Sequence, residues 1–503
     1  MIPVIADLDV AFKALAPRAG DWQAILPEIC VAGLAVLCLL QAMLLSEKLR
    51  WLIPATMRAG LALIILMSVI PTAPWFHPTF KPFAGLFHLG HFAQFGPRLV
   101  FLLSALLTSF VGEKFLRQRQ LSVPDYHHVL LIVTAAFMLL AGTNHFVSFF
   151  VCLETAAVGL YVLVGYLRRS SASLEAGVKY LVMGGLSSAL LLMGIVLVYG
   201  SLGGLGVKDS LDFDQIQAAL EAGKFTALTL VGVALILSGV MFKLGVFPFH
   251  AWIPDVYQGA PTPTTALLST ASKAAGAFSL FVLVTTPFHA LAVRIAPLLA
   301  GLTVITILVG NLSALASTNV KRILALSGVS HAGFLLAIIT VAVVNWDYQA
   351  IHWYASDTLW IYLLAYTVGT FLTTQSLISM PVADDHDRPM LSLRKLMRRS
   401  PILTAALGFG LSSLAGVPPT VGFAAKLLVL ILLVKAKLWW VLGAALVGVT
   451  ISIYYYFSIL REAVIRPAED NEEIHTIPTS FLERFLIGAL AALTVIGSVL
   501  IFI

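Results

Sequence analysis

Charged residues are scarce in this sequence of 503 residues: only 11% are Asp, Glu, Lys or Arg, whereas 59% are hydrophobic. A soluble protein carries about 25% charged residues, and the mean hydropathy of this chain is +0.95. The composition therefore excludes an ordinary soluble globular domain. It indicates an all-α polytopic membrane protein whose main surroundings are the lipid bilayer.

The sequence also lacks the motifs that hold nucleotides, metals or electron carriers. It contains no Walker motif, no GxGxxG after a strand, and no His pair at metal or haem spacing. The three cysteines, Cys30, Cys38 and Cys152, lie in apolar runs without CxxC spacing and are expected to be buried apolar side chains. We therefore expect no cofactor and no metal in this chain.

Nucleic acid is not an expected partner, although the net charge is +6 and the pI is about 9.1. The basic residues stand in short loops that flank hydrophobic runs, where they set the topology of a membrane protein. A nucleic-acid-binding domain would instead gather them on one face or along one helix.

About fourteen apolar runs are long enough to cross a hydrocarbon core of about 30 Å as helices. Their edges are expected within about three residues. The runs lie near residues 24–45, 53–71, 96–113, 127–143, 145–167, 176–200, 226–247, 259–284, 294–315, 321–344, 357–380, 401–434, 438–460 and 485–503. The connections 201–225 and 380–400 are expected to hold surface helices on opposite faces.

The loops that follow odd-numbered runs hold most of the Lys and Arg residues, among them Arg168, Arg169, Lys321 and Arg322. The positive-inside bias places these loops in the cytoplasm. It follows that both termini are predicted on the periplasmic, or outer, side.

Two runs are interrupted. Residues 239–276 contain Lys243 before a turn rich in Pro, His and Trp, and the run 401–434 is broken by a Gly-Val-Pro-Pro segment before Lys426. Broken helices at membrane depth are tolerated only where protein or water satisfies the free backbone groups. A pair of them in corresponding positions is the pattern of a transporter built from inverted repeats.

Several ionisable residues stand inside these runs, where each costs free energy and is a candidate for function. The basic ones assigned to run interiors are all lysines, whose ammonium can release a proton when it is desolvated, whereas arginine cannot. The candidate proton-transfer residues are Glu154, Lys179, Lys243, Lys273, His331 and Lys426.

Glu154 is the one acid deep inside a run, and a carboxylate there would stabilise a nearby ammonium until the contact is removed. His331 could relay a proton between lysines at neutral pH. Simpler readings stay open: Lys179, near the start of its run, could be a snorkelling anchor, and His331 could be a packing residue. Glu28 and Glu175 are weaker candidates because they lie near the ends of runs.

Four segments together resemble the antiporter-like membrane subunits of respiratory complex I. They are FPFHAWIPDVYQGAPTP, STASKAAG, NLSALASTNVKRILALSGVSHAGF and GVPPTVGFAAK. The resemblance covers roughly residues 24–500, and the long match over 239–276 is its most specific part. Related cation/proton antiporter and membrane-bound hydrogenase subunits share the general pattern but usually differ at DVYQGAP.

The resemblance implies a bundle of about 14 transmembrane helices with two inverted five-helix repeats and broken helices at spans 7 and 12. It further implies that Glu154 pairs with Lys243, that Lys273 is central, and that Lys426 lies on the exit side. One integral membrane domain, 1–503, would divide into N-terminal helices 1–3 (1–126), a first repeat with helices 4–8 (127–284), a second repeat with helices 9–13 (285–460), and a loop with helix 14 (461–503).

The implied function is proton translocation within NADH:quinone oxidoreductase, a translocase of the bacterial inner membrane. Quinone, NADH, flavin and iron-sulfur clusters would be bound by partner subunits, and other membrane-arm subunits would be the partners. Three alternatives remain open. The chain could belong to a cation/proton antiporter or membrane-bound hydrogenase-type complex, act on lipid-linked substrates, or serve as a structural anchor.

Overall fold

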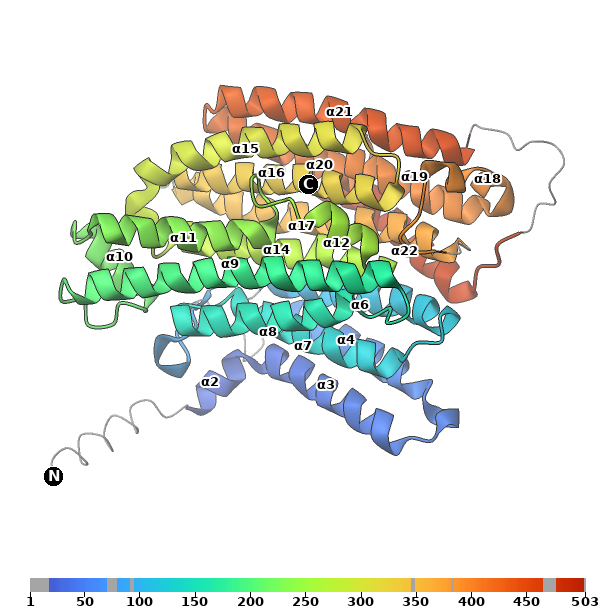
Figure 1. The fold of residues 1–503 in the computed structure, drawn as a ribbon, viewed down its shortest axis with the longest axis horizontal. Helices are drawn as coiled ribbons and strands as arrows, with labels where there is room; N and C mark the ends of the chain where they lie inside the picture. Colours follow the sequence, from blue (N-terminus) through green and yellow to red (C-terminus); the bar gives the residue numbers. More distant parts are fainter. Residues whose placement is uncertain are drawn as a thin grey trace.

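The computed structural model of the chain describes residues 18–69, 79–90, 95–344, 349–380, 384–464 and 476–501. Within these ranges the long helices lie side by side with their axes roughly aligned (Figure 1). A short antiparallel pair, β1 (Thr79–Phe80) and β2 (Leu89–Gly90), is the one sheet of the described ranges. The predicted all-helical class is confirmed.

The first half of the described chain forms a series of helices joined by short turns. They are α2 (Ala19–Ala24), α3 (Leu26–Leu44), η1 (Glu47–Leu49), α4 (Leu52–Val69), η2 (Phe83–Gly85), α6 (Gly96–Gln118), α7 (Val123–Leu140), α8 (Phe146–Val164), α9 (Ser171–Gly203), α10 (Phe213–Glu221), α11 (Ala227–Leu244) and α12 (Ile253–Gly259).

The second half begins with one span made of three consecutive segments, in which the π-helical turn η3 separates two α-helices. The helices are α13 (Thr262–Leu267), η3 (Leu268–Ser272), α14 (Lys273–Thr285), η4 (His289–Leu291), α15 (Ala292–Leu315), α16 (Val320–Val344), α17 (Gln349–Ser379), η5 (Met390–Leu393), α18 (Leu396–Arg399), α19 (Pro401–Ala415), α20 (Val421–Lys435), α21 (Trp439–Val464) and α22 (Phe481–Leu500).

Thirteen helices of the described chain are long and apolar enough to cross a membrane. They correspond to thirteen of the fourteen predicted runs. The remaining run, 401–434, is divided into the shorter helices α19 and α20, at the position where the Gly-Val-Pro-Pro segment predicts a break.

Both interruptions have the same kind of helix end. The helix α11 stops at Leu244, where Gly245 adopts a left-handed conformation with φ of 81°, and α19 stops at Ala415, where Gly416 has φ of 82°. Glycine takes this conformation without the steric penalty that a β-carbon brings. The two glycines therefore fix where the apolar helices end and where backbone groups become free.

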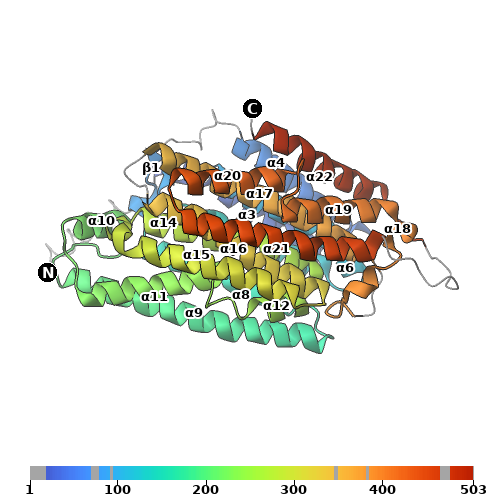
Figure 2. The same ribbon diagram turned by 90° about the horizontal axis from the view of Figure 1, so that it is seen from above.

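The spans differ in how deeply they are buried. In the most apolar windows of Thr262–Thr285 and Val320–Val344, 94% of the residues are buried, whereas the figure for Phe481–Leu500 is 22%. The helices α13, α14, α16 and α17 thus form the centre. The helices α3, α9, α15, α21 and α22 carry exposed apolar side chains, and α9 and α22 lie on opposite sides of the bundle (Figure 2). An apolar outer face is what hydrocarbon surroundings require.

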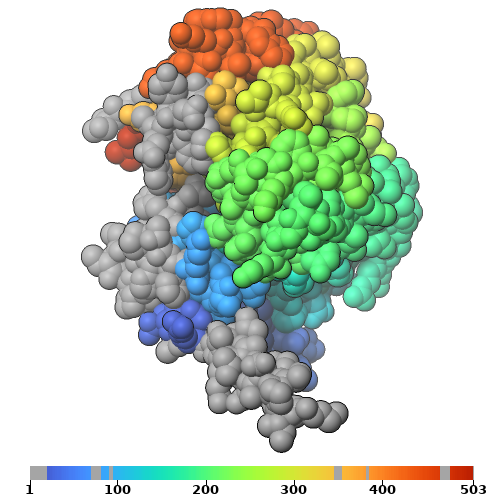
Figure 3. All heavy atoms as spheres, turned by 90° about the vertical axis from the view of Figure 1, so that its left-hand side faces the viewer, coloured from blue at the N-terminus to red at the C-terminus, as the bar shows by residue number. Residues whose placement is uncertain are grey.

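The two ends of the bundle carry different connections. The surface helix α10 lies at one end, which faces the viewer in Figure 3, and α18 lies at the opposite end (Figure 1). The predicted surface helix in 201–225 is thus confirmed as α10. In 380–400 the described residues form only the short η5 and α18, because Pro389 and Pro401 limit the length of any helix between them.

Candidate functional site

Three of the predicted lysines lie in the interior of the bundle. The side chains of Lys243 on α11, Lys273 at the start of α14 and Lys426 on α20 are 9%, 1% and 4% exposed. A buried ammonium is costly unless it is paired or hydrogen-bonded. Their surroundings therefore decide what each of them can do.

Lys243 stands one residue before the end of α11, and its Nζ atom has no hydrogen-bond partner among the described residues. Its Nζ atom lies 5.7 Å from the ring centroid of Tyr161 on α8, within the range of a cation–π contact. Glu154 lies two turns before Tyr161 on the same face of α8, and it accepts a hydrogen bond from Ser188 on α9 instead. The implied Glu154–Lys243 pair is not in direct contact among the described residues.

Lys273 follows the π-helical turn η3, a local widening of the helix that recurs at functional sites. Its Nζ atom has no hydrogen-bond partner among the described residues. A β-carbon on Gly328 of α16 would lie 3.5 Å from this Nζ atom and 3.3 Å from the Tyr366 hydroxyl. Because Gly328 has no side chain, the Lys273 amine and the Tyr366 hydroxyl can both lie against its backbone.

The span of Lys273 also packs directly against the end of α11. A β-carbon on Gly276 would lie 2.6 Å from the backbone nitrogen of Leu244, the residue after Lys243. Gly276 and Lys273 are three positions apart and share a helix face. The absence of a side chain at Gly276 therefore brings the segments that carry Lys243 and Lys273 together.

His331 on α16 is fixed by two tyrosines. Its Nδ1 atom lies 2.7 Å from the Tyr362 hydroxyl of α17, and its Nε2 atom lies 3.4 Å from the Tyr456 hydroxyl of α21. The ring centroid of Tyr366 lies 4.5 Å from that of His331. An imidazole between hydroxyl groups can accept a proton on one nitrogen while it donates from the other.

Lys426 lies close to His331, on the second half of the broken helix. Its Nζ atom donates to the carbonyl of Ala415, the last residue of α19, at 2.8 Å, and lies 3.5 Å from the Ser452 hydroxyl of α21. Lys426, His331 and Tyr366 line one small cavity of about 10 Å³. The broken helix thus supplies a free carbonyl that holds the lysine beside the histidine.

Lys179 does not join these residues. Its side chain on α9 is 45% exposed and forms ion pairs with Glu175 at 2.8 Å and with Asp255 at 3.1 Å. Burial raises the pKa of Asp255, but hydrogen bonds from Lys179 and Arg322 outweigh this and lower it below its usual range. Lys179 is therefore part of a surface ion-pair cluster.

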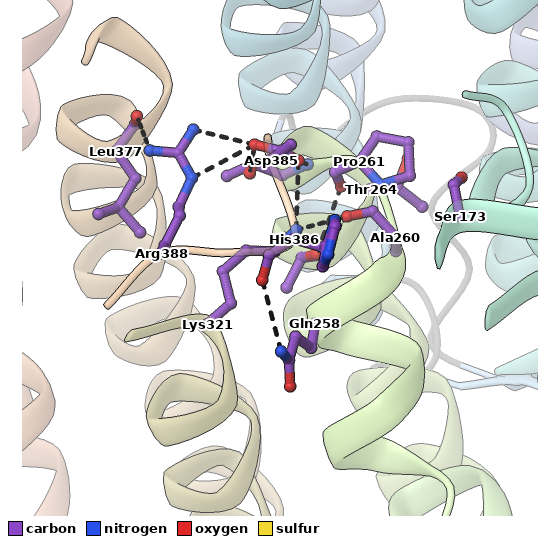
Figure 4. A network of polar contacts seen from close by, with 12 residues as sticks. Ser173, Gln258, Ala260, Pro261, Thr264, Lys321, Leu377, Asp385, His386 and Arg388 are labelled. Carbon is purple, nitrogen blue, oxygen red and sulfur yellow. Dashed lines mark hydrogen bonds and ion pairs between the residues drawn. The ribbon is translucent and has the colours of Figure 1, made fainter. Parts of the chain in front are cut away.

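The structure corrects the expectation that the buried basic residues are the four lysines. Arg98 is 1% exposed and pairs with Glu28 at 2.6 Å, and both Lys321 and Arg388 are buried around Asp385 (Figure 4). Hydropathy places all three in loops, because Arg98 and Lys321 stand at the edges of runs and Arg388 lies in the connection 380–400. Arg98 and Lys321 are buried by partners distant in sequence, whereas Arg388 pairs with Asp385 three residues away, and hydropathy alone reveals none of these contacts.

Sequence reasoning also missed the tyrosines that surround the lysines and the histidine. They are Tyr161, Tyr180, Tyr362, Tyr366 and Tyr456, of which all but Tyr161 are buried. A buried tyrosine usually hydrogen-bonds through its hydroxyl. The signal available in the sequence is that each of these tyrosines lies within a predicted apolar run, where a hydroxyl group needs a polar partner.

Within the described ranges no group of three or more His, Cys, Asp or Glu side chains could hold a metal ion. The arrangement that the structure does show consists of amines, hydroxyls and an imidazole in the interior of the bundle. These are groups that accept and donate protons.

Comparison with known proteins places this chain in a family. Residues 143–452 match the family model described as "NADH:quinone oxidoreductase/Mrp antiporter, TM". A relative from Opitutus terrae, NADH-quinone oxidoreductase subunit N 1, is 43% identical over 457 residues, which are 89% of this chain and 88% of the relative.

Solved structures share the fold. A chain of respiratory complex I from Thermus thermophilus with bound aureothin has a TM-score of 0.75 and 29% identity, covering 94% of this chain and 97% of its own. A chain of the Mrp complex from Dietzia sp. DQ12-45-1b has a TM-score of 0.73 and 20% identity, covering 95% and 96%. The second likeness shows the fold alone.

Proposed function

Since this chain belongs to the NADH:quinone oxidoreductase/Mrp antiporter family, and within it to the N subunits of NADH-quinone oxidoreductase, we propose that its buried lysines and His331 carry the translocated proton. It is a multi-pass membrane subunit of the proton-translocating membrane arm of complex I. The path that we propose runs from Glu154 and Lys243 through Lys273 and His331 to Lys426.

One observation carries this proposal: two buried lysines whose Nζ atoms have no hydrogen-bond partner among the described residues, Lys243 and Lys273, stand on segments in contact. His331 lines a cavity with Lys426 and with Tyr366, whose hydroxyl lies beside Lys273. A purely structural lysine in a protein interior would be expected to be paired, because an unpaired charge is costly. An amine that can give up its proton avoids this cost, and lysine is suited to such exchange.

Each residue has a role in the proposed path. Glu154 acts on Lys243 through its charge and not through a hydrogen bond, so a change in its surroundings alters how firmly Lys243 holds its proton. Lys273 passes the proton toward His331, with Tyr366 beside both. His331 hands it to Lys426, from which it leaves the bundle.

Lys179 would take part at the surface. It lines an open cavity of about 160 Å³ with Glu175 and Asp255, and these carboxylates could exchange protons with it. A neighbouring membrane-arm subunit would be the expected cover for such a charged cluster on a membrane-spanning helix, because lipid does not solvate charge.

The finer architecture is part of the same proposal. Residues 127–284 and 285–460 would be two inverted five-helix repeats, and the matching left-handed glycines Gly245 and Gly416 at the two broken helices support this division. Both termini would lie on the periplasmic side of the bacterial inner membrane. Quinone, NADH, flavin and iron-sulfur clusters would be held by other subunits, whose reaction supplies the energy.

The test compares proton pumping and quinone reduction in membrane vesicles for Lys243→Ala, Lys243→Arg and the wild type, after assembly of the complex is verified. Arginine keeps the charge but does not release its proton. Loss of both activities in both variants is expected. Normal pumping by Lys243→Arg would show that the lysine only holds a charge in place. Lys208→Ala, a change at an exposed loop lysine, is the matched control.

A further inference from the structure

Asp385 is a buried carboxylate held by groups from three separate parts of the chain (Figure 4). It accepts hydrogen bonds from the Thr262 backbone nitrogen at 2.9 Å and the Thr262 hydroxyl at 2.7 Å. Lys321 Nζ lies 3.2 Å and Arg388 Nη2 lies 2.9 Å from its oxygens. We call Thr262, Lys321, Asp385 and Arg388 the entrance cluster.

The cluster fixes the start of the helix that carries Lys273. The N-cap of α13 is Pro261, which offers no side-chain acceptor, so the first backbone N–H of the helix would lack a partner. Asp385 supplies that acceptor from the chain segment after α17, and its negative charge suits a helix N-terminus. The span from Thr262 through Lys273 is thereby anchored to the loop.

Lys321 is placed by the same cluster. It stands at the beginning of α16, where the helix dipole disfavours a cation. It is held there by Asp385 and by the Ala260 carbonyl, to which its ammonium donates. Without the Asp385 charge, Lys321 and Arg388 would be two buried cations close together, with Arg119 at 3.9 Å from the same carboxylate.

Two cavities meet at this cluster. On the outer side lies an open hollow of about 620 Å³, the vestibule, lined by Arg119, Arg168, Asp384 and Asp385 among others. On the inner side lies a cavity of about 20 Å³, the hydroxyl cavity, with room for one water molecule. Thr262 and Lys321 line the hydroxyl cavity, whereas their partner Asp385 lines the vestibule. The entrance cluster is therefore the partition between the two.

The hydroxyl cavity leads toward the proposed proton path. Its lining is rich in groups that can relay a proton, namely Thr265, Ser269, Ser327, Thr370 and Tyr366. Tyr366 also lines the cavity of His331 and Lys426, and its hydroxyl lies beside Lys273 over Gly328. A proton that enters from the vestibule would thus meet the buried residues at their centre.

We infer that Asp385 is a positioning residue that holds Lys321 and the start of α13 together and so closes the hydroxyl cavity toward the vestibule. The closure keeps protons from exchanging freely between the vestibule and Lys273. The vestibule lies where the loops after α6, α8 and α17 meet, the end predicted to face the cytoplasm. The effect of this closure on pumping rests on the proposed proton path. The closure itself does not, because it follows from the contacts of Asp385.

The first experiment measures closure independently of pumping, in the assembled complex in membranes. Thr370→Cys places a thiol in the hydroxyl cavity. The rate of its reaction with methyl methanethiosulfonate is followed by mass spectrometry on the peptide that contains residue 370. Asp385→Asn should make this reaction several-fold faster, Asp385→Glu should largely restore the slow rate, and Asp387→Asn, the same change at an exposed neighbour, should leave it unchanged.

The second readout is the number of protons pumped per quinone reduced. Asp385→Asn should lower this ratio while quinone reduction continues, whereas general destabilisation would lower the amount of complex and leave the ratio unchanged. If Asp385→Asn does not assemble, Thr262→Val decides, because it removes one hydrogen bond to Asp385 and leaves every charge in place. The inference is overturned if the thiol at position 370 reacts at the wild-type rate in the assembled Asp385→Asn variant. If that variant does not assemble, the same result in Thr262→Val overturns it. Faster labelling with an unchanged pumping ratio would retain the closure and overturn the path through Lys273.

Discussion

The Nδ1 atom of His331 lies 2.7 Å from the hydroxyl of Tyr362, whereas the Nε2 atom of the same ring lies 3.4 Å from the hydroxyl of Tyr456. The first contact has the length of a good hydrogen bond, and the second is at the limit. The partner of one ring nitrogen sets which nitrogen carries the proton. Tyr362 therefore orients His331, and the looser side is the one free to exchange a proton.

Tyr362→Phe is expected to slow proton-coupled quinone reduction by about 10-fold or more, because it releases the imidazole from its fixed orientation. Tyr456→Phe should have a smaller effect, since the contact that it removes is longer. The measurement is quinone reduction with proton uptake in vesicles. Tyr454→Phe on the exposed face of α21 is the control, and equal rates for Tyr362→Phe and this control would remove the role assigned to Tyr362.

The two halves of the second broken helix meet at Gly422. A β-carbon there would lie 1.8 Å from the carbonyl oxygen of Ser413 on α19, a distance that no backbone contact allows. Gly422→Ala must push α20 away from α19 and so move Lys426, which lies one turn further on the same face. We expect a loss of about 3 kcal/mol or more in stability, together with loss of pumping.

Gly443→Ala is the matched control for this prediction, because a β-carbon on Gly443 of α21 meets no atom within 4 Å. An alanine in an exposed helix interior stabilises by about 1 kcal/mol relative to glycine. The thermal stability and pumping of the assembled complex are compared for the two variants. Equal behaviour would contradict the tight packing of α19 on α20.

The pair of Glu28 and Arg98 links α3 to α6 in the interior, with an Oε1–Nε distance of 2.6 Å. Arg98 also donates to the Ala24 carbonyl at 3.0 Å. Glu28→Gln leaves a buried guanidinium without its counter-charge, which is expected to lower the free energy of unfolding by about 3–5 kcal/mol. The readout is thermal unfolding of the subunit in detergent.

The same Glu→Gln change in an exposed ion pair shows whether the loss of stability comes from burial or from the loss of a negative charge alone. Glu47 lies 3.8 Å from Arg50, and both side chains are largely exposed. Glu47→Gln should alter the free energy of unfolding by less than about 1 kcal/mol. A Glu28→Gln variant as stable as Glu47→Gln would show that the buried pair does not hold α3 to α6.

Much of the fold could be predicted because the bilayer imposes long apolar helices on the sequence. The runs near 24–45 and 226–247 correspond to α3 and α11, and the break before Lys426 lies where the Gly-Val-Pro-Pro segment predicts it. Hydropathy and backbone-breaking residues are local signals, which a single sequence carries in full.

The pairing of side chains could not be predicted in the same way. Asp385 meets Thr262 across 123 residues, and Arg98 meets Glu28 across 70, so no local pattern records either contact. Lys179 shows the converse: its sequence surroundings are apolar, yet its side chain faces outward because the helix α9 lies at the periphery. The roles of Glu154, Lys243, Lys273, His331 and Lys426 stay predictions.

Asp385 also predicts how stability responds to acid. Burial alone would raise its pKa, but Lys321 and Arg388 outweigh burial and hold the pKa well below its usual range. The carboxyl of an unfolded chain has a pKa of about 3.9, so on acidification the unfolded state binds a proton before the native state does. The stability from Asp385 is therefore present in full above that pKa and is lost as the pH falls through the lower native pKa.

Asp385→Asn cannot titrate and lacks this contribution at every pH. The difference in thermal stability between the wild type and Asp385→Asn, followed by unfolding of the subunit in detergent, should be greatest at neutral pH. It should shrink progressively as the pH falls below about 4, because the unfolded wild-type chain then binds a proton that native Asp385 does not yet bind. Asp387→Asn, an exposed change in the same loop, should follow the wild type throughout. A gap between wild type and Asp385→Asn that stays constant with pH would mean that the Asp385 charge is not what stabilises the entrance cluster.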